Sequence, residues 1–115
     1  MRIVTALGLI LLLLSTGAQA AKKKGVRFWN LTSETLVEVS LAPVGSGQFG
    51  ANQCLNDKDK SVDFDEDVPV VGIVPGHYDI RTKDDKGLTC LAKNIEVKAD
   101  EAFSIRDKDL TGCAK

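Results

Sequence analysis

The sequence predicts an all-β protein, a small antiparallel β-sandwich or partly open barrel of six to seven strands that follows a cleaved signal peptide. Three observations support this fold class. Short runs of alternating apolar and polar residues recur along the chain, and turn signals separate them about every ten residues. Beyond the first 20 residues, no segment carries a helical apolar stripe longer than about one turn. The connecting segments are also too short for the crossovers of a parallel sheet.

The first 20 residues have the three parts of a secretory signal peptide. Arg2 supplies the positive charge, residues 3–14 form the apolar segment, and Ala18-Gln19-Ala20 supplies small residues at the cleavage site. The apolar segment is too short to span about 30 Å of hydrocarbon. We therefore expect residues 21–115 to form one β-sandwich domain without a membrane span, periplasmic or secreted.

The first two predicted strands form a hairpin. Residues 25–31 are apolar and aromatic with partial alternation, and residues 35–42 alternate cleanly. Residues 32–34 are short enough to be the turn between them. Residues 43–53 hold three glycines and a proline, which indicates a long loop.

Two further segments are predicted strands of weaker character. Residues 60–65 alternate weakly, with Val62 and Phe64 on one face. Residues 68–74 form an apolar run rich in β-branched side chains that ends at Pro75-Gly76.

The second half of the chain contains the clearest hairpin. Residues 78–83 and 88–97 flank the turn 84–87, in which Gly87 suits a positive φ. Residues 103–106 form a last strand. The alternation along all strands predicts this core: Phe28, Val37, Val39, Leu41, Val62, Phe64, Val71, Ile73, Tyr78, Ile80, Leu91, Ile95, Val97, Phe103 and Ile105.

Three cysteines lie in the predicted mature chain, and an oxidising compartment allows them to pair. Of the three possible single bridges we favour Cys90 with Cys113, because it ties the end of the chain to an internal strand. A bridge closing a loop of about two dozen residues contributes about 3 kcal/mol in the chain-entropy model. Cys54 is then left over, either as a buried apolar thiol or as an exposed thiol available to a partner.

Charge argues against a nucleic-acid partner. Loss of Arg2 with the signal peptide leaves 14 basic and 16 acidic residues, a net charge of −2. Binding a phosphate backbone needs lysines and arginines clustered along one face. The basic cluster at residues 22–24 is expected to be a solvated tail.

No pattern predicts a catalytic, cofactor or metal site, so we expect no enzyme. Asp57, Asp59, Ser61, Asp63 and Asp65 recur at every second position, as in a calcium-binding loop. An EF-hand loop starting at Asp57, however, needs a glycine and a bidentate glutamate where Val62 and Val68 stand. We interpret them as the solvated face of an edge strand, with a weak adventitious Ca²⁺ site as the alternative. His77 is the single histidine. Asp79 and Arg81 are interpreted as a solvated strand face.

A set of short motifs resembles a group of small exported bacterial proteins with no assigned activity, which carry an N-x-[ST] first hairpin, a "sp.gs..WG" loop and a "PG.YDIR…DG" hairpin. The matching residues are Asn30-Leu31-Thr32, 38–43, Gly45-Ser46, Phe49-Gly50, 75–81, Asp85 and Gly87. Phe49 replaces the tryptophan of that group, and Lys86 separates Asp85 from Gly87. The turn at residues 75–78 is similar to that of transthyretin-like and carboxypeptidase-regulatory β-sandwich modules, which implies a fold and no chemistry.

We expect a non-catalytic exported domain that acts by contact with a ligand or an extracytoplasmic protein. The loop 43–53 is the predicted contact surface, with Gln48, Phe49 and Asn52, because loops on a rigid sandwich commonly carry recognition. Phe49 is either an exposed interface anchor or a plug at the end of the sandwich. The alternative is a small secreted inhibitor or immunity protein of an extracytoplasmic enzyme, which would present a rigid protruding loop.

Overall fold

The structure is a computed structural model that describes residues 25–115. The predicted signal peptide, residues 1–20, and the lysines at 22–24 lie outside the described residues. In chain order the elements are β1 (Arg27–Leu31), β2 (Leu36–Pro43), η1 (Gln53–Asn56), β3 (Asp67–Pro69), β4 (Gly76–Asp84), β5 (Thr89–Val97), β6 (Ala102–Arg106), η2 (Asp107–Asp109) and β7 (Leu110–Ala114), where η denotes a 3-10 helix.

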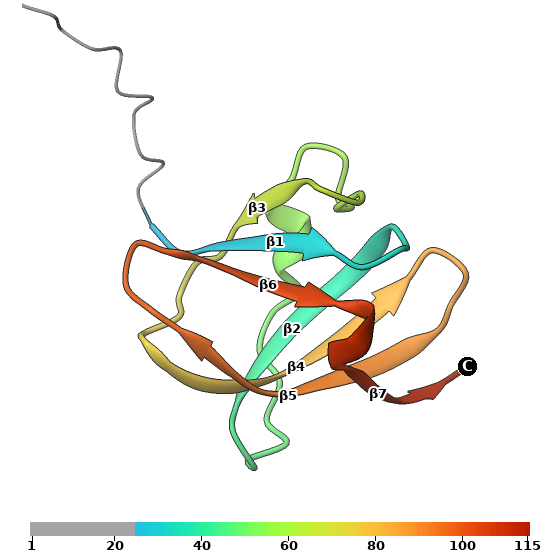
Figure 1. The fold of residues 1–115 in the computed structure, drawn as a ribbon. Helices are drawn as coiled ribbons and strands as arrows, with labels where there is room; N and C mark the ends of the chain where they lie inside the picture. Colours follow the sequence, from blue (N-terminus) through green and yellow to red (C-terminus); the bar gives the residue numbers. More distant parts are fainter. Residues whose placement is uncertain (1–24) are drawn as a thin grey trace, which may run out of the picture.

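The strands form two layers (Figure 1). One sheet has the order β3-β1-β6 and the other the order β2-β4-β5-β7. The predicted hairpin of residues 25–31 with 35–42 is therefore wrong, because β1 and β2 lie in different sheets. Side chains from both sheets share one hydrophobic cluster, so the predicted all-β fold of two packed sheets is confirmed. None of the helices in the described part of the chain has the length and hydropathy of a membrane span.

One strand pair departs from the predicted antiparallel arrangement. β1 and β6 are parallel, with Phe28 beside Phe103, whereas the pairs β1–β3, β2–β4, β4–β5 and β5–β7 are antiparallel. Antiparallel direction follows from a short hairpin. Most of the chain separates β1 from β6, so no hairpin constrains their direction.

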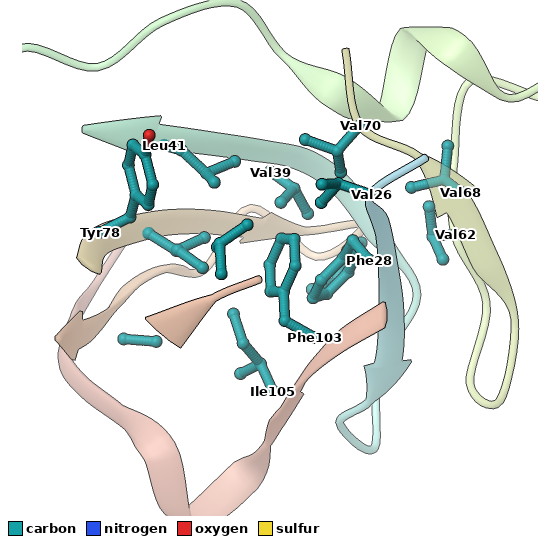
Figure 2. Packing of buried hydrophobic residues seen from close by; sticks show 14 of the residues in the cluster. Val26, Phe28, Val39, Leu41, Val62, Val68, Val70, Tyr78, Phe103 and Ile105 are labelled. Atoms are coloured by element: carbon teal, nitrogen blue, oxygen red, sulfur yellow. The ribbon is translucent and has the colours of Figure 1, made fainter. Parts of the chain in front are cut away.

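The core lies between the two sheets. The rings of Phe28 and Phe103 pack with their centroids 5.5 Å apart; Val39 of β2 lies over them, and Leu41 of β2 lies beside Tyr78 (Figure 2). Nine predicted core residues are buried, and two more, Ile73 and Ile95, pack against the cluster. The nine are Phe28, Val39, Leu41, Val62, Tyr78, Ile80, Val97, Phe103 and Ile105.

Bulges explain two errors in the predicted core. The register between β2 and β4 shifts at Val37, so Leu36 is buried and Val37 is only half-buried. A second shift inserts an extra residue of β5 opposite β4, next to Asn94, whose φ is 54°. An inserted residue reverses the alternation beyond it. Ala92 therefore faces the core and Leu91 does not.

The two weaker predicted strands are mostly irregular. Residues 60–65 are not a strand: Val62 alone forms an isolated bridge with Leu36, and Phe64 is 61% exposed. Positive φ angles at Lys60 and Asp65, 58° and 66°, break the extended backbone on either side.

The apolar run 68–74 likewise contributes only to the three-residue strand β3. Gly72 has a φ of 72°, which turns the chain away from β1 after Val70. Val68 and Val70 are the residues that face the core, so Val71 lies on the opposite side of the chain and is 61% exposed instead of lying in the predicted core.

Candidate functional site

The predicted contact residue Asn52 is fully engaged with β2. Its Oδ1 accepts hydrogen bonds from the backbone N–H groups of Val39 (3.0 Å) and Cys54 (3.0 Å), and its Nδ2 donates to the Val37 carbonyl (2.8 Å). The Gly50 N–H donates to the Leu41 carbonyl (2.9 Å). The segment 50–54 thus covers the open edge of β2, which protects that edge from pairing with another chain.

Phe49 packs on the outward face of the four-stranded sheet. The Arg81 guanidinium lies 4.5 Å from its ring centroid, and Arg81 Nε donates to Glu38 Oε2 at 2.7 Å. Arg81 alternates along β4 with buried Ile80 and Thr82, which places the stacked pair outside the core. Phe49 is half-buried in this position, neither a plug between the sheets nor a freely exposed anchor.

The longest exposed run of the predicted contact loop covers residues 43–48, and its segment from Val44 to Gln48 follows the end of β2. It projects from the end of β2 (Figure 1). Asp79 holds its base, because Asp79 Oδ2 accepts from Gly45 N (2.9 Å) while Oδ1 accepts from Asn94 N (3.0 Å) in the β5 bulge. These two hydrogen bonds lower the pKa of Asp79. Asp79 is therefore a brace between loop and bulge as well as part of an outward strand face.

The favoured disulfide is present. Cys90 in β5 and Cys113 in β7 are bonded, with an S–S distance of 2.06 Å. Cys54 is free and buried, and burial, followed by the nearby charges of Glu38 and Asp57, raises its pKa to about 12. Its thiol is protonated at neutral pH and has no nucleophilic thiolate to offer.

A cavity of about 260 Å³ lies at one end of the sandwich. The β1–β2 turn, the β4–β5 hairpin and the C-terminal segment meet at this end, on the right of Figure 1. The lining residues are Thr32, Ser33, Glu34, Leu36, Thr82, Asp84, Leu88, Cys90, Asp107, Leu110 and Cys113.

Two buried polar side chains of β4 line this cavity. The inward face of β4 is apolar at Tyr78 and Ile80 and becomes polar at Thr82 and Asp84, which are 1% and 7% exposed. The Thr82 hydroxyl has no hydrogen-bond partner among residues 25–115, and no side-chain oxygen in that range is both sealed from solvent and unpartnered. The hydroxyl therefore reaches solvent through the cavity that Thr82 lines.

Asp84 also keeps one oxygen available. Its Oδ1 accepts hydrogen bonds from the backbone N–H groups of Lys86 and Leu88, both at 2.9 Å, which shapes the hairpin turn. No residue between 25 and 115 donates a hydrogen bond to Oδ2. Because no unpartnered side-chain oxygen of residues 25–115 is sealed from solvent, Oδ2 reaches solvent at the cavity that Asp84 lines and is free to accept a hydrogen bond there.

The walls combine negative charge with apolar surface. Glu34 and Asp107 join Asp84, and the lining contains no lysine or arginine. Glu34 pairs with Lys86 (3.0 Å), whose pKa this contact raises, and Asp107 Oδ1 accepts from Ser33 N (2.9 Å). The apolar walls are Leu36, Leu88, Leu110 and the disulfide.

The described residues hold no group of three or more His, Cys, Asp or Glu side chains that is suited to bind a metal ion. The acidic side chains between Asp57 and Asp65 point to different neighbours. Asp63 Oδ1 accepts from Thr35 Oγ1 (2.8 Å), and Asp65 Oδ1 accepts from Trp29 Nε1 (3.0 Å). His77 lies 3.5 Å from Glu96 across the β4–β5 pair.

Comparison with protein-family models, with curated proteins and with solved structures finds no match to this chain. The candidate site therefore depends on the geometry alone. The sequence pattern predicts neither Thr82 nor Asp84 at a site, and it assigns Asp84 to the turn 84–87. Two polar residues at the end of an otherwise apolar strand face are the sequence signal from which this cavity could have been predicted.

Proposed function

We propose that this chain is a non-catalytic exported domain, periplasmic or secreted, that acts by binding, and that the cavity at the end of the sandwich is its binding site. One observation carries the proposal: Thr82 and Asp84 are buried, and each has an oxygen atom that only an occupant of the cavity or water can satisfy. Binding sites combine apolar walls with a few convergent polar groups in this way.

The disulfide supports an extracytoplasmic location, because thiols are kept reduced in the cytosol of most cells. The signal-peptide pattern of residues 1–20 predicts the same location. A binding role without catalysis is supported by the chemistry of the walls. The one lining hydroxyl bonded to a carboxylate, Ser33 Oγ to Asp107 Oδ1 at 3.2 Å, belongs to an exposed residue, and no histidine or lysine lines the cavity to act as a base.

A titration followed by amide NMR tests the site. We expect at least one of a set of small probes of about four to six carbons, drawn from amines, alcohols and carboxylic acids, to shift the amide signals of Thr82, Asp84 and Leu88 selectively. Leu88→Trp fills the cavity and should abolish these shifts. Leu91→Trp is the matched control, because Leu91 is half-buried but lies outside the cavity.

Two outcomes would contradict the binding site. Either no probe perturbs the lining amides of the wild-type protein, or Leu88→Trp and Leu91→Trp leave the shifts equally intact.

A specific feature also favours the alternative of an inhibitor of an extracytoplasmic enzyme. The segment 44–48 protrudes and is braced at Gly45 by Asp79, and Val44 at its base is 53% exposed. Under this proposal an enzyme co-purifies from periplasmic extract with the wild-type protein and with Leu88→Trp but not with Val44→Glu. Loss with Leu88→Trp alone would instead assign the contact to the cavity.

A further inference from the structure

We infer that the cavity accepts a primary ammonium group on an unbranched aliphatic stem, as in a lysine side chain or a free alkylamine. This inference rests on the proposed function and specifies the chemistry of its ligand. It follows from the charge, the available acceptors and the apolar walls of the cavity, taken in turn.

Charge selects a cation. Three carboxylates line the cavity, and the one lysine bonded to them, Lys86, is paired with Glu34. Asp107 is bonded to the neutral Ser33, and Asp84 to neutral backbone groups. Lys86 also lies near enough to Asp84 to interact with its charge, so one lysine serves three carboxylates and the walls keep a net negative charge. An anionic ligand would be repelled, and a cation would be attracted.

The acceptors select an ammonium over a guanidinium. A guanidinium binds a carboxylate best through two parallel hydrogen bonds, one to each oxygen. Asp84 Oδ1 already accepts two backbone N–H groups, so only Oδ2 remains. An ammonium carries three donors on one atom. It can donate to Asp84 Oδ2 and to the Thr82 hydroxyl, two residues apart on the inward face of β4.

The remaining walls suit a methylene stem. Leu36, Leu88 and Leu110 give apolar contact of the kind that covers the stems of lysine side chains. The volume of about 260 Å³ lies between a cavity of about 150 Å³ that holds benzene and the smallest sites for drug-sized molecules, about 300 Å³. The cavity therefore fits one side-chain-sized group.

Titration with three matched probes tests this inference. Butylamine, butanol and butyrate share a four-carbon stem and differ in the head group. We expect butylamine to bind most tightly and butyrate to show no binding. Asp84→Asn should weaken butylamine binding about tenfold or more, because a hydrogen bond to a charged group is lost. The asparagine Oδ1 still accepts from Lys86 N and Leu88 N, so the hairpin is preserved.

Two further variants complete the test. Asp85→Asn removes an exposed carboxylate of the same hairpin that lines no part of the cavity, and it should change the affinity by no more than about twofold. Thr82→Val replaces the hydroxyl by a methyl group of the same shape and should weaken butylamine binding several-fold. The affinity for butanol should fall only by the loss of the hydrogen bond between the butanol hydroxyl and Thr82.

A second pair of probes identifies the source of the ligand. Nα-acetyl-lysine methylamide that binds at least as tightly as butylamine indicates a lysine side chain of a partner, and exclusion of this peptide-like probe indicates a free alkylamine. Tighter binding of the corresponding arginine derivative would overturn the choice of ammonium.

The failure of this inference differs from the failure of the binding site. If butanol binds as tightly as butylamine and Asp84→Asn has no effect, the cavity binds ligands but does not select a cation. If none of the three probes shifts the lining amides, the cavity is not a binding site, and both proposals fall.

Discussion

At the scale of single residues, two polar side chains that the sequence predicts to face solvent or a partner instead form hydrogen bonds with backbone groups. Asp79 links the contact loop to the β5 bulge, and Asn52 bonds the edge of β2. Both lie at positions where the regular strand pairing is interrupted and backbone groups lack a strand partner. Their short polar side chains replace the missing strand at those points.

The brace formed by Asp79 predicts a pH dependence of stability. The native pKa of Asp79 is lowered by its two backbone hydrogen bonds, so the carboxylate stabilises the fold fully above its unfolded pKa, about 3.9. This stabilisation is lost as the pH falls through the lower native pKa. Asp79→Ala should therefore be less stable than wild type at pH 7, and the difference should shrink below about pH 4.

Denaturant titration across this pH range measures the effect. Asp85→Ala, in the exposed hairpin turn, is the matched control and should show a smaller difference at pH 7. Equal stabilities of Asp79→Ala and wild type at pH 7 would show that the brace contributes nothing.

At the scale of elements, a short segment lies at each edge of the four-stranded sheet. The segment 50–54 covers the edge of β2, and β7 forms the opposite edge. β7 is exposed along most of its length, so few apolar contacts hold it to β5. The disulfide supplies the attachment that packing does not.

Loss of the disulfide should therefore destabilise the protein. Cys113→Ser should lower the free energy of unfolding by about 2–4 kcal/mol, as is usual for a native bridge in a small secreted domain. Cys54→Ser should cost less, because Cys54 closes no loop. In the unfolded, unreduced wild-type protein, a thiol reagent should label Cys54 alone. Peptide mapping that finds Cys54 in an intramolecular disulfide would refute this assignment.

At the scale of the whole molecule, turns and irregular segments contribute to both the cavity and the acidic segment. The cavity forms where the β1–β2 turn, the β4–β5 hairpin and the C-terminal segment meet, and the acidic residues 57–67 form a separate irregular segment. The second group resembles a calcium loop only in its spacing, because its carboxylates bond to different neighbours.

We therefore expect no calcium site of micromolar or tighter affinity in residues 57–67. Val62 and Val68 stand where a turn-forming glycine and a bidentate glutamate are needed. Val62 is also held in the core through its bridge to Leu36. Isothermal titration with CaCl₂ should give no saturable heat at micromolar concentrations, and a saturable site would overturn this interpretation.

Export predicts a defined mature chain. Protein recovered from the extracytoplasmic fraction of its native host should begin at Ala21 and carry no lipid, because Ala18-Gln19-Ala20 meets the requirement of the signal peptidase and no cysteine lies nearby. Intact mass spectrometry measures this. A mass that still includes Met1 would contradict export by cleavage.

The sequence by itself determined the fold class, the central core and the favoured cysteine pair. Alternation is a local property, so it placed Tyr78 and Ile80 correctly wherever a strand ran without interruption. Only the tertiary structure decided the parallel pairing of β1 with β6 and the positions of the bulges, because both depend on which distant segments meet. The bulge beside Asn94 reversed the pattern in β5 and exchanged Leu91 for Ala92 in the core. The cavity has the same origin, since its walls come from three segments that only the packing of the two sheets brings together.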